Sequence, residues 1–508
     1  MTGGPYVLGC DVGSQGTNVA LYAADGTLVG SSYQTYDLSF PFPGAAEQDA
    51  DDWAPAIAAG VRELLALVPE GASAVKGLSF GSQLDGMIGC GADGKALRPA
   101  LIWMDRRAED QAAAVAKAID PAAFYRAVGA NLDSSHAVFK ALWVRDQEPD
   151  VWSRAASLLT PGSYVLREVA ATLAVDHSNA SSMALLDPRT RAWSEEALAA
   201  VDLPSSLLPE VVAATEPIAT VSAAFAEATG LDPSTVVAVG CGDEMAATLG
   251  AGVYAPGDVC DVVGTAEPVC AASAEPREDP TMLVECHPHA DPDAWLLENP
   301  GFVSGGNLRW WRDQFAPIER DAEAVGLGDA YDFLSTEAGH VEPGAEGLVF
   351  LPCMQGAMAP EWNGAARGVF YGLTLAHTRD HMTRAILEGS AFALRDILTA
   401  MTDAGLDVRR LTIVGGGAKG PLWRQIKADV TGLPVRVPVS VETTATGAAI
   451  LAAVGSGVHA SIADAVEAFV AYRPDVHEPD PAAAAAYDEA YSRYRSVYDA
   501  LRPVFAAG

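Results

Sequence analysis

The sequence predicts an α/β protein made of two halves with a related plan. Strand-like and helix-like stretches alternate along most of the chain, and the first half opens with a strand, a small-residue turn and a second strand. GDVCDVVGTAEPVCAAS repeats that opening from Gly257. Alternating strands and helices are typical of the α/β class. The 508 residues are enough for two cores of up to ~250–300 residues, although one domain per ~150 residues leaves three open. We expect domains over residues 1–255 and 256–508.

Local signals in the first half support each of its elements. Apolar strand patterns flank the first turn, and Asp-Gly at 25–26 is a hairpin signal. Apolar residues at helical spacing predict a helix over residues 52–67. Strand VKGLSF follows, with another hairpin turning at the Asp-Gly of 93–94. Residues 108–230 are mostly helical in pattern, with Pro-containing turns between the helices.

The later elements follow the same alternation. Strand VVAVG leads into the acidic segment CGDEM, which opens a short helix. Beyond the repeated opening, the pattern predicts a helix over residues 379–404, strand LTIVGGG, a helix over residues 421–431 and an Ala-rich helix after Thr446.

The charge balance restricts the partners of the protein. Lys and Arg total 32 against 66 Asp and Glu, a formal charge of −34. Such a surface repels phosphate backbones and anionic lipid headgroups, which disfavours nucleic acid and membrane surfaces as partners. A nucleotide substrate would therefore need Mg²⁺ and local N–H donors. The sequence leaves a homodimer open.

Cysteine usage and targeting signals favour the cytoplasm. The cysteines are scattered with no C-x-x-C pair, which favours a reducing compartment over a disulfide or zinc framework. The start, MTGGPYVLGCDVG, lacks the basic and long apolar regions of a signal peptide. Residues 443–463 are uncharged, but their Gly, His, Ser and Thr content predicts a buried helix and loop rather than a membrane span.

The first small-residue turn is a candidate phosphate site. Gly13 and Gly16 permit positive φ, and Ser14, Gln15 and Thr17 offer donors. Successive backbone N–H groups in such a turn form an anion-binding concavity. Taken alone, this segment is explained better by an ordinary hairpin turn.

The second half carries a matching turn at Gly264-Thr265-Ala266. Alone it is a weak signal. Two such turns, each opening one half, suggest two lobes that hold one polyphosphate from opposite sides.

Two acidic residues lie where strands end. Asp243 follows a strand and precedes a helix, and ligands of open α/β sheets gather at the carboxyl ends of strands. It can be a helix N-cap or a general base for a hydroxyl nucleophile. Asp11 ends the first strand, where a carboxylate can hold Mg²⁺ through water.

Three further motifs are weaker. GCGADGKA at 89–96 lacks the last Ser/Thr of a Walker A loop and lies on a hairpin. GGGAKG at 415–420 matches G-x-G-x-x-G between a strand and a helix, which keeps NAD binding as a minority alternative. CHPH at 286–289 has no partner cluster, and we interpret it as a surface strand or loop rather than a metal site.

Together these motifs resemble the FGGY carbohydrate kinases, and the xylulokinase branch most closely. The resemblance runs from DVGSQGTN to ETTATGAAILA and includes WMDRR at 103–107, DHSNASSMALLD at 176–187, GCGDEM, VVGTAEPV, SGGNLRWWRD at 304–313 and GGGAKGPLWRQIKADVTGLPV. The family is part of the actin/hexokinase-like superfamily of two-lobed ATPases with ribonuclease-H-like cores. The resemblance therefore implies two lobes around a central cleft.

The resemblance also implies roles for individual residues. Asp243 is the expected catalytic base, and Asp11 helps to place Mg²⁺. ATP is expected at Gly13, Ser14 and Gln15 in one lobe and at Gly264, Thr265, Gly305, Gly417 and Gly420 in the other. The sugar is expected against Gln83, Leu84, Asp85, Trp103 and Asp105, with Ser135 and His136 beside them.

Departures from the family pattern bear on the substrate. Glu244 replaces the Asn that follows the base, Ala266 replaces a Ser of the phosphate turn, and Asp85 replaces the His of the xylulokinase sugar wall. The resemblance implies phosphorylation of D-xylulose at its terminal hydroxyl, with another ketose or a sugar alcohol as the alternative acceptor. An actin-like ATPase switch without a sugar acceptor stays open as a different class.

Overall fold

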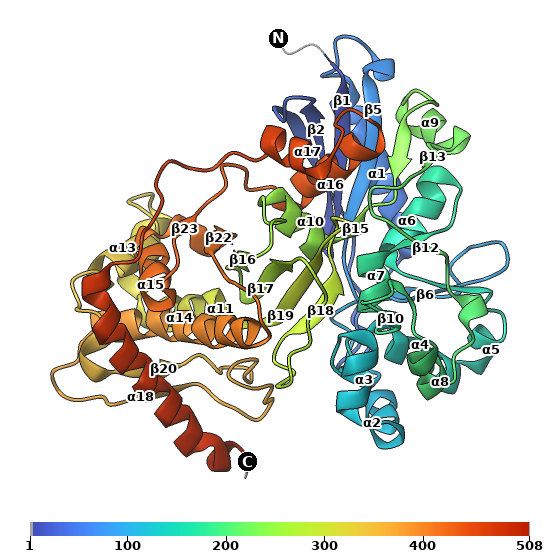
Figure 1. The fold of residues 1–508 in the computed structure, drawn as a ribbon. Helices are drawn as coiled ribbons and strands as arrows, with labels where there is room; N and C mark the ends of the chain where they lie inside the picture. The colour runs from blue at the N-terminus through green and yellow to red at the C-terminus, as the bar shows by residue number, and fades with distance from the viewer. Residues whose placement is uncertain (1–3, 507–508) are drawn as a thin grey trace.

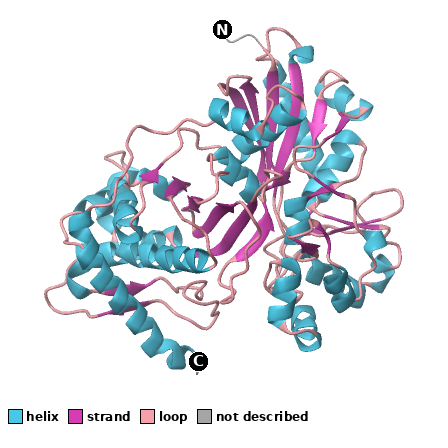
Figure 2. Cartoon of the chain, viewed as in Figure 1, coloured by secondary structure: helices cyan, strands magenta, loops and turns pink. Residues whose placement is uncertain are grey.

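Two twisted sheets, one in each half of the chain, organise the fold (Figure 1). The computed structural model describes residues 4–506. Each lobe has its own apolar core, and helices cover the faces of both sheets (Figure 2).

The sheet of the N-terminal lobe has the order β13-β14-β5-β1-β2-β3. Strands β1, β2 and β3 are antiparallel neighbours, whereas β5 and β14 run parallel to β1. The strands are β1 (Tyr6–Val12), β2 (Gly16–Ala23), β3 (Leu28–Thr35), β5 (Val75–Ser82), β13 (Pro217–Thr220), β14 (Val236–Ala238) and β15 (Cys241–Gly242), which also pairs with β5.

The sheet of the C-terminal lobe repeats this plan with the order β18-β19-β17-β16-β22-β23. Strands β16, β17 and β19 are antiparallel neighbours, and β22 and β23 run parallel to β16. The strands are β16 (Asp258–Val262), β17 (Ala266–Ser273), β18 (Glu285–Pro288), β19 (Trp295–Val303), β22 (Arg410–Val414) and β23 (Val435–Arg436). The related plan that the repeated opening predicted is therefore present.

Short strand pairs and helices complete the lobes. The pairs are β4 (Glu47–Gln48) with β7 (Ala100–Leu101), β6 (Ile88–Cys90) with β8 (Ser157–Leu159), β9 (Val175–Asp176) with β12 (Val211–Val212), β10 (Leu186–Asp187) with β11 (Ala192–Trp193), and β20 (Val349–Leu351) with β21 (Val369–Tyr371).

The helices of the first lobe are α1 (Trp53–Leu65), α2 (Glu109–Ala118), α3 (Pro121–Val128), α4 (Ala137–Gln147), α5 (Pro149–Trp152), α6 (Pro161–Ala170), α7 (His177–Ser182), α8 (Glu195–Val201), α9 (Ala223–Thr229) and α10 (Asp243–Gly250). Those that follow are α11 (Gly305–Phe315), α12 (Pro317–Ala324), α13 (Ala330–Ala338), α14 (Arg379–Asp403), α15 (Pro421–Thr431), α16 (Thr443–Gly455), α17 (Ile462–Phe469) and α18 (Pro481–Phe505). The helices expected over 52–67, 379–404 and 421–431 are confirmed as α1, α14 and α15.

Helix α16 comes late in the chain but packs on the first lobe, beside β1 in Figure 1. A Cβ on Gly9 would lie 2.0 Å from the carbonyl oxygen of Ala445, and one on Gly447 would lie 1.9 Å from that of Ala246 in α10. Glycine is thus required at both crossings, because any side chain would push the helix away. Apolar side chains of α10 and α16 form a third core together with side chains from both sheets.

Asp11 and Asp261 hold equivalent positions in the two sheets. Asp11 precedes the last pair of β1 with β5, and Asp261 precedes the last pair of β16 with β22. Their surroundings differ. Lys427 Nζ lies 2.5 Å from Asp261 Oδ2 and 2.8 Å from Glu267 Oε1, and all three side chains are at most 1% exposed. The charge of Asp261 is therefore balanced by Lys427 of the protein itself.

Within residues 4–506, no helix combines the length and the apolar character needed to cross a membrane. The uncharged stretch 443–463 instead contains α16, whose residues are mostly buried.

Candidate active site

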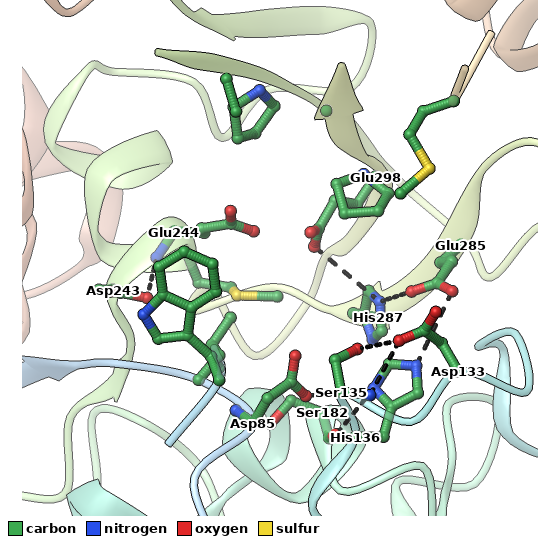
Figure 3. A pocket seen from close by; sticks show the side chains of 18 of the residues that line it. Asp85, Asp133, Ser135, His136, Ser182, Asp243, Glu244, Glu285, His287 and Glu298 are labelled. Atoms are coloured by element: carbon green, nitrogen blue, oxygen red, sulfur yellow. Dashed lines mark hydrogen bonds and ion pairs between the residues drawn. The ribbon is translucent and has the colours of Figure 1, made fainter. Parts of the chain in front are cut away.

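A cavity of about 450 Å³ lies between the lobes and collects residues from both (Figure 3). The first lobe contributes the loop after β5, the loop after β7, the start of α4 and the start of α10. The second contributes β17, β18, β19 and the loop after β20. The lining residues are Ser14, Leu84, Asp85, Trp103, Arg106, Asp133, Ser135, His136, Ser182, Asp243, Glu244, Met245, Ala266, Pro268, Glu285, His287, Glu298, Pro300, Gly301, Met358 and Trp362.

Asp243 is the first residue of α10 and lies directly after β15. Its Oδ1 accepts a hydrogen bond from the backbone N–H of Glu244 at 3.0 Å. Burial raises the pKa of the Asp243 carboxyl well above its ordinary value, and the carboxylates of Glu244 and Asp11 raise it further. A carboxylate with a raised pKa is a stronger proton acceptor, which suits a general base.

Asp85 faces the same cavity from the loop after β5. Its φ is +57°, a left-handed conformation in which Asp and Asn are enriched among residues with side chains. Its Oδ1 lies 3.1 Å from His136 Nδ1, and Lys140 Nζ donates to its carbonyl oxygen at 2.6 Å. Asp85 does not pair with Arg106 or Arg107, because Arg106 is bonded to Asp133 and Arg107 to Asp105.

His136 is charged at neutral pH. Burial alone would lower its pKa, but the carboxylates of Asp85, Glu285 and Asp133 around it raise that pKa to about 9. Its Nε2 is buried, lies 4.0 Å from Glu285 Oε1 and makes no hydrogen bond to the protein. This nitrogen is therefore a donor without a hydrogen-bond partner on the cavity wall.

Two residues predicted at the sugar wall lie behind it. Gln83 is 1% exposed and donates from Nε2 to Gln48 Oε1 at 2.7 Å. The Gln48 amide in turn donates to the carbonyl oxygen of Ser14 at 2.6 Å. Asp105 is fully buried and is ion-paired with Arg107. Both residues support the wall, whereas Leu84, Asp85, Trp103 and His136 form it.

The back wall of the cavity contains acidic residues that the sequence patterns did not single out. Glu285 and His287 lie on β18, and Glu298 stands opposite Glu285 in register on β19. His287 Nε2 lies 3.3 Å from Glu285 Oε2 and 3.9 Å from Glu298 Oε2, and its Nδ1 lies 2.8 Å from Ser181 Oγ. The interpretation of CHPH as a surface segment is wrong, because this strand is buried against α7 of the other lobe.

A second cavity, of about 470 Å³, brings together the five ATP residues predicted in the C-terminal lobe. A Cβ on Gly305 would lie 2.3 Å from Gly264 O, and one on Gly417 would lie 2.2 Å from Val263 Cγ1. These contacts explain why glycine occupies both positions. The lining residues are Val263, Gly264, Thr265, Gly305, Leu308, Arg309, Asp329, Tyr331, Asp332, Ser335, Gly416, Gly417, Lys419, Gly420 and Trp423.

The turn predicted to hold phosphate in the first lobe lies at the other cavity. Gly13 N–H donates to Gly16 O at 3.1 Å, Gln15 is exposed, and Ser14 Oγ accepts from Trp103 Nε1 at 2.7 Å. Ser14 and Ala266, which belong to the two turns, line the same cavity. The turns therefore face a common space between the lobes.

The surroundings of Asp11 fit a hard divalent cation. Burial raises the pKa of Asp11 to about 7, with a further contribution from Glu442. Asn18 Nδ2 donates to Glu442 Oε2 at 2.6 Å, and the charge of Asp11 also acts on Asp243. Several carboxylates that repel one another are stabilised by a cation with oxygen ligands, such as Mg²⁺.

Comparisons with known proteins agree with this geometry. The model of the N-terminal domain of the FGGY family of carbohydrate kinases matches residues 6–250, and the model of its C-terminal domain matches residues 261–456. A gluconokinase from Bacillus licheniformis is 30% identical over 455 residues, which cover 89% of this chain and 88% of the relative. An autoinducer-2 kinase from Salmonella paratyphi B is 31% identical, covering 99% of this chain and 96% of the relative.

A solved structure supports the same fold. The crystal structure of a xylulose kinase from Rhodospirillum rubrum matches with a TM-score of 0.92 at 30% identity, covering 99% of this chain and 100% of that one. The predicted two-lobed, actin/hexokinase-like architecture is thereby confirmed.

Proposed function

Since the chain belongs to the FGGY family of carbohydrate kinases, we propose that it transfers the γ-phosphoryl group of ATP to a hydroxyl of a small sugar, with D-xylulose as the first candidate. The observation that carries this proposal is Asp243, a carboxylate of raised pKa that faces a cavity lined by hydrogen-bonding side chains. Another pentulose or a sugar alcohol is the alternative within the class. Gluconate is a second candidate, because one of the relatives is a gluconokinase.

In the proposed reaction, the acceptor lies against Leu84, Asp85 and Trp103. Asp243 takes the proton of the attacking hydroxyl as the oxygen bonds to the γ-phosphorus, and ADP leaves. Phosphoryl transfer depends mainly on positioning and on neutralising charge.

The nucleotide is held by the glycine-rich turns. The turns that contain Ser14 and Gly264-Thr265 are proposed to hold the phosphates, and Gly417 and Gly420 are proposed to lie against the adenosine. Mg²⁺, when bound, would supply positive charge for the phosphates, and Asp11 is the residue proposed to hold it.

An acceptor screen tests the proposal. ADP release from ATP is measured with a coupled assay over pentuloses, hexuloses, pentitols, hexitols and gluconate. The proposal expects ADP release that depends on one of these acceptors. ATP hydrolysis that no acceptor stimulates would instead favour an ATPase switch, and NADH binding without ATP binding would favour a dinucleotide enzyme.

The variant Asp85→Asn should lower kcat/KM for the preferred acceptor by about 10- to 150-fold. Asn tolerates the same left-handed backbone, so the change removes the charge and keeps the shape. Hydrogen bonds to charged groups contribute about 1.5–3 kcal/mol, and each ~1.4 kcal/mol is a factor of ten in rate. The measurement is kcat/KM over the same acceptor panel.

The matched control is Asp25→Asn, which changes an exposed aspartate of the β2–β3 hairpin. It should leave kcat/KM unchanged. If Asp85→Asn stays within twofold of the wild type for every acceptor, Asp85 does not contact the sugar.

A further inference from the structure

Two glutamates from opposite lobes meet in the sugar cavity. Glu244 comes from the first turn of α10, Glu298 comes from β19, and their side chains hydrogen-bond to each other. A carboxylate oxygen of each and Cys270 Sγ all lie within 4.8 Å of one another. Figure 3 shows the pair between Asp243 on one side and Glu285 with His287 on the other.

One proton must be shared within this pair. An ionised carboxylate only accepts hydrogen bonds, so two carboxyl groups can bond to each other only when one of them keeps its proton. Burial raises the pKa of Glu298 to about 7 and the pKa of Glu244 well above its ordinary value. The pair then offers one O–H donor and several acceptor oxygens to the cavity.

The basic side chains of the wall already lie beside carboxylates. Arg106 is paired with Asp133, His136 with Asp85, and His287 Nε2 lies 3.3 Å from Glu285 Oε2. Among the described lining residues, each basic side chain has a carboxylate partner, so none brings an uncompensated positive charge to an anionic ligand. The titratable groups that act on the pair from the surrounding elements are Asp85, Asp243, Cys260, Cys270, Glu285 and His287.

A second observation, on His136, also indicates that a ligand binds at this wall. His136 Nε2 has no hydrogen-bond partner although its side chain is only 7% exposed. A buried donor of this kind is costly unless a ligand or water accepts its proton. A hydroxyl oxygen can do so, and neighbouring hydroxyls of the same molecule can bond to the carboxyl pair.

We propose that Glu244 and Glu298 form a one-proton carboxyl pair that binds hydroxyls of the acceptor and excludes acceptors that carry a carboxylate or a phosphate. This inference rests on the proposed kinase function and narrows its substrate to uncharged polyols and ketoses. An acceptor that carries a carboxylate would lie beside several carboxylates of the protein, with no free positive charge nearby. Such like-charge contacts are strongly unfavourable.

The test compares acceptors that differ in charge and share a carbon chain. The pairs are xylitol with xylonate and glucitol with gluconate, together with D-xylulose, each assayed for kcat/KM. The wild type should prefer the best uncharged acceptor over every aldonate by at least ~100-fold. In Glu298→Gln this preference should fall by ~10-fold or more, because one negative charge is lost while the amide still donates a hydrogen bond.

Two further variants control for misfolding of Glu298→Gln and for the general effect of removing a glutamate charge. Glu244→Gln changes the other member of the pair and should relax the preference in the same direction if Glu298→Gln fails to fold. Glu489→Gln, which changes an exposed glutamate of α18, should leave the preference unchanged. Thermal unfolding is compared for all four proteins.

A pH profile separates recognition from a merely structural role. In the wild type, Glu298 ionises as the pH passes above about 7, while Glu244, whose pKa is raised well above its ordinary value, keeps the shared proton. The preference for uncharged acceptors over aldonates should therefore grow as the pH rises through about 7, because the pair gains a negative charge. In Glu298→Gln this growth should be smaller, since the amide does not ionise.

Three results would overturn the inference. The first is an aldonate that is phosphorylated as well as the best uncharged acceptor. The second is a preference and pH profile that neither variant changes. The third is stoichiometric Zn²⁺ binding that both Glu298→Gln and Cys270→Ser abolish, which would make the pair a metal site. If no acceptor stimulates ADP release in the wild type, the proposed function itself fails, and the inference fails with it.

Discussion

The variant Asp243→Asn should lose ~10²- to 10⁴-fold in kcat, because general-base catalysis by a positioned side chain contributes about that much. The amide keeps the shape of the side chain but cannot take the proton of the hydroxyl. ATP binding should persist, since the second cavity does not include residue 243. Steady-state kinetics under conditions where chemistry limits the rate, with calorimetry for ATP, measure both effects.

The pH dependence gives an independent check on this residue. A base must be unprotonated, so wild-type kcat/KM should fall as the pH drops through the raised pKa of Asp243. The residual activity of Asp243→Asn should lack this acid limb. Asp232→Asn, an exposed change in the same lobe, is the matched control. If Asp243→Asn keeps more than about a third of wild-type kcat, the carboxylate serves the N-terminus of α10 and not the chemistry.

The variant Lys427→Met should destabilise the protein by about 3–5 kcal/mol, the usual cost of removing one partner from a buried ion pair. It leaves Asp261 and Glu267 without their counter-charge in a site with almost no solvent exposure. Chemical denaturation at neutral pH measures the loss. Lys419→Met, which changes an exposed lysine of the same lobe, should stay within ~0.5 kcal/mol of the wild type.

The cost of Lys427→Met should also grow with pH. Without Lys427, the two buried carboxyls have raised pKa values in the folded state and bind protons that the unfolded chain releases. Stability then falls as pH rises, because the folded state binds more protons than the unfolded state. The difference from the wild type should therefore be smaller near pH 5 than near pH 8. A difference that is constant with pH would mean that the site adjusts without charge.

Local patterns were sufficient for the features that depend on neighbouring residues. Asp243 could be placed because a strand end followed by a helix is visible over a few residues, and the turns at Gly13 and Gly264 are visible in the same way. Strand and helix existence also follows from local periodicity. These signals led to the two-lobed fold and to Leu84, Asp85, Trp103 and His136, which line the cavity between the lobes.

The acidic back wall could not be predicted because it depends on pairing between distant segments. Periodicity indicates that a strand exists but does not give its partner or register. Glu298 reaches the cavity through its pairing with β18, and His287 is buried because β18 meets α7 of the other lobe. Similarly, nothing near Asp105 in the sequence reveals that the backbone N–H of Ala46 would donate to its carboxylate.

The position of α16 has a consequence for the order of events during synthesis. The strands β1 and β5 leave the ribosome before the second lobe, but the helix that covers them, against Gly9, comes several hundred residues later in the chain. Until that helix emerges, an apolar face of the first sheet lacks its cover, and exposed apolar surface promotes aggregation in nascent chains. The lobe made first is therefore completed only after the strands of the second lobe have been made.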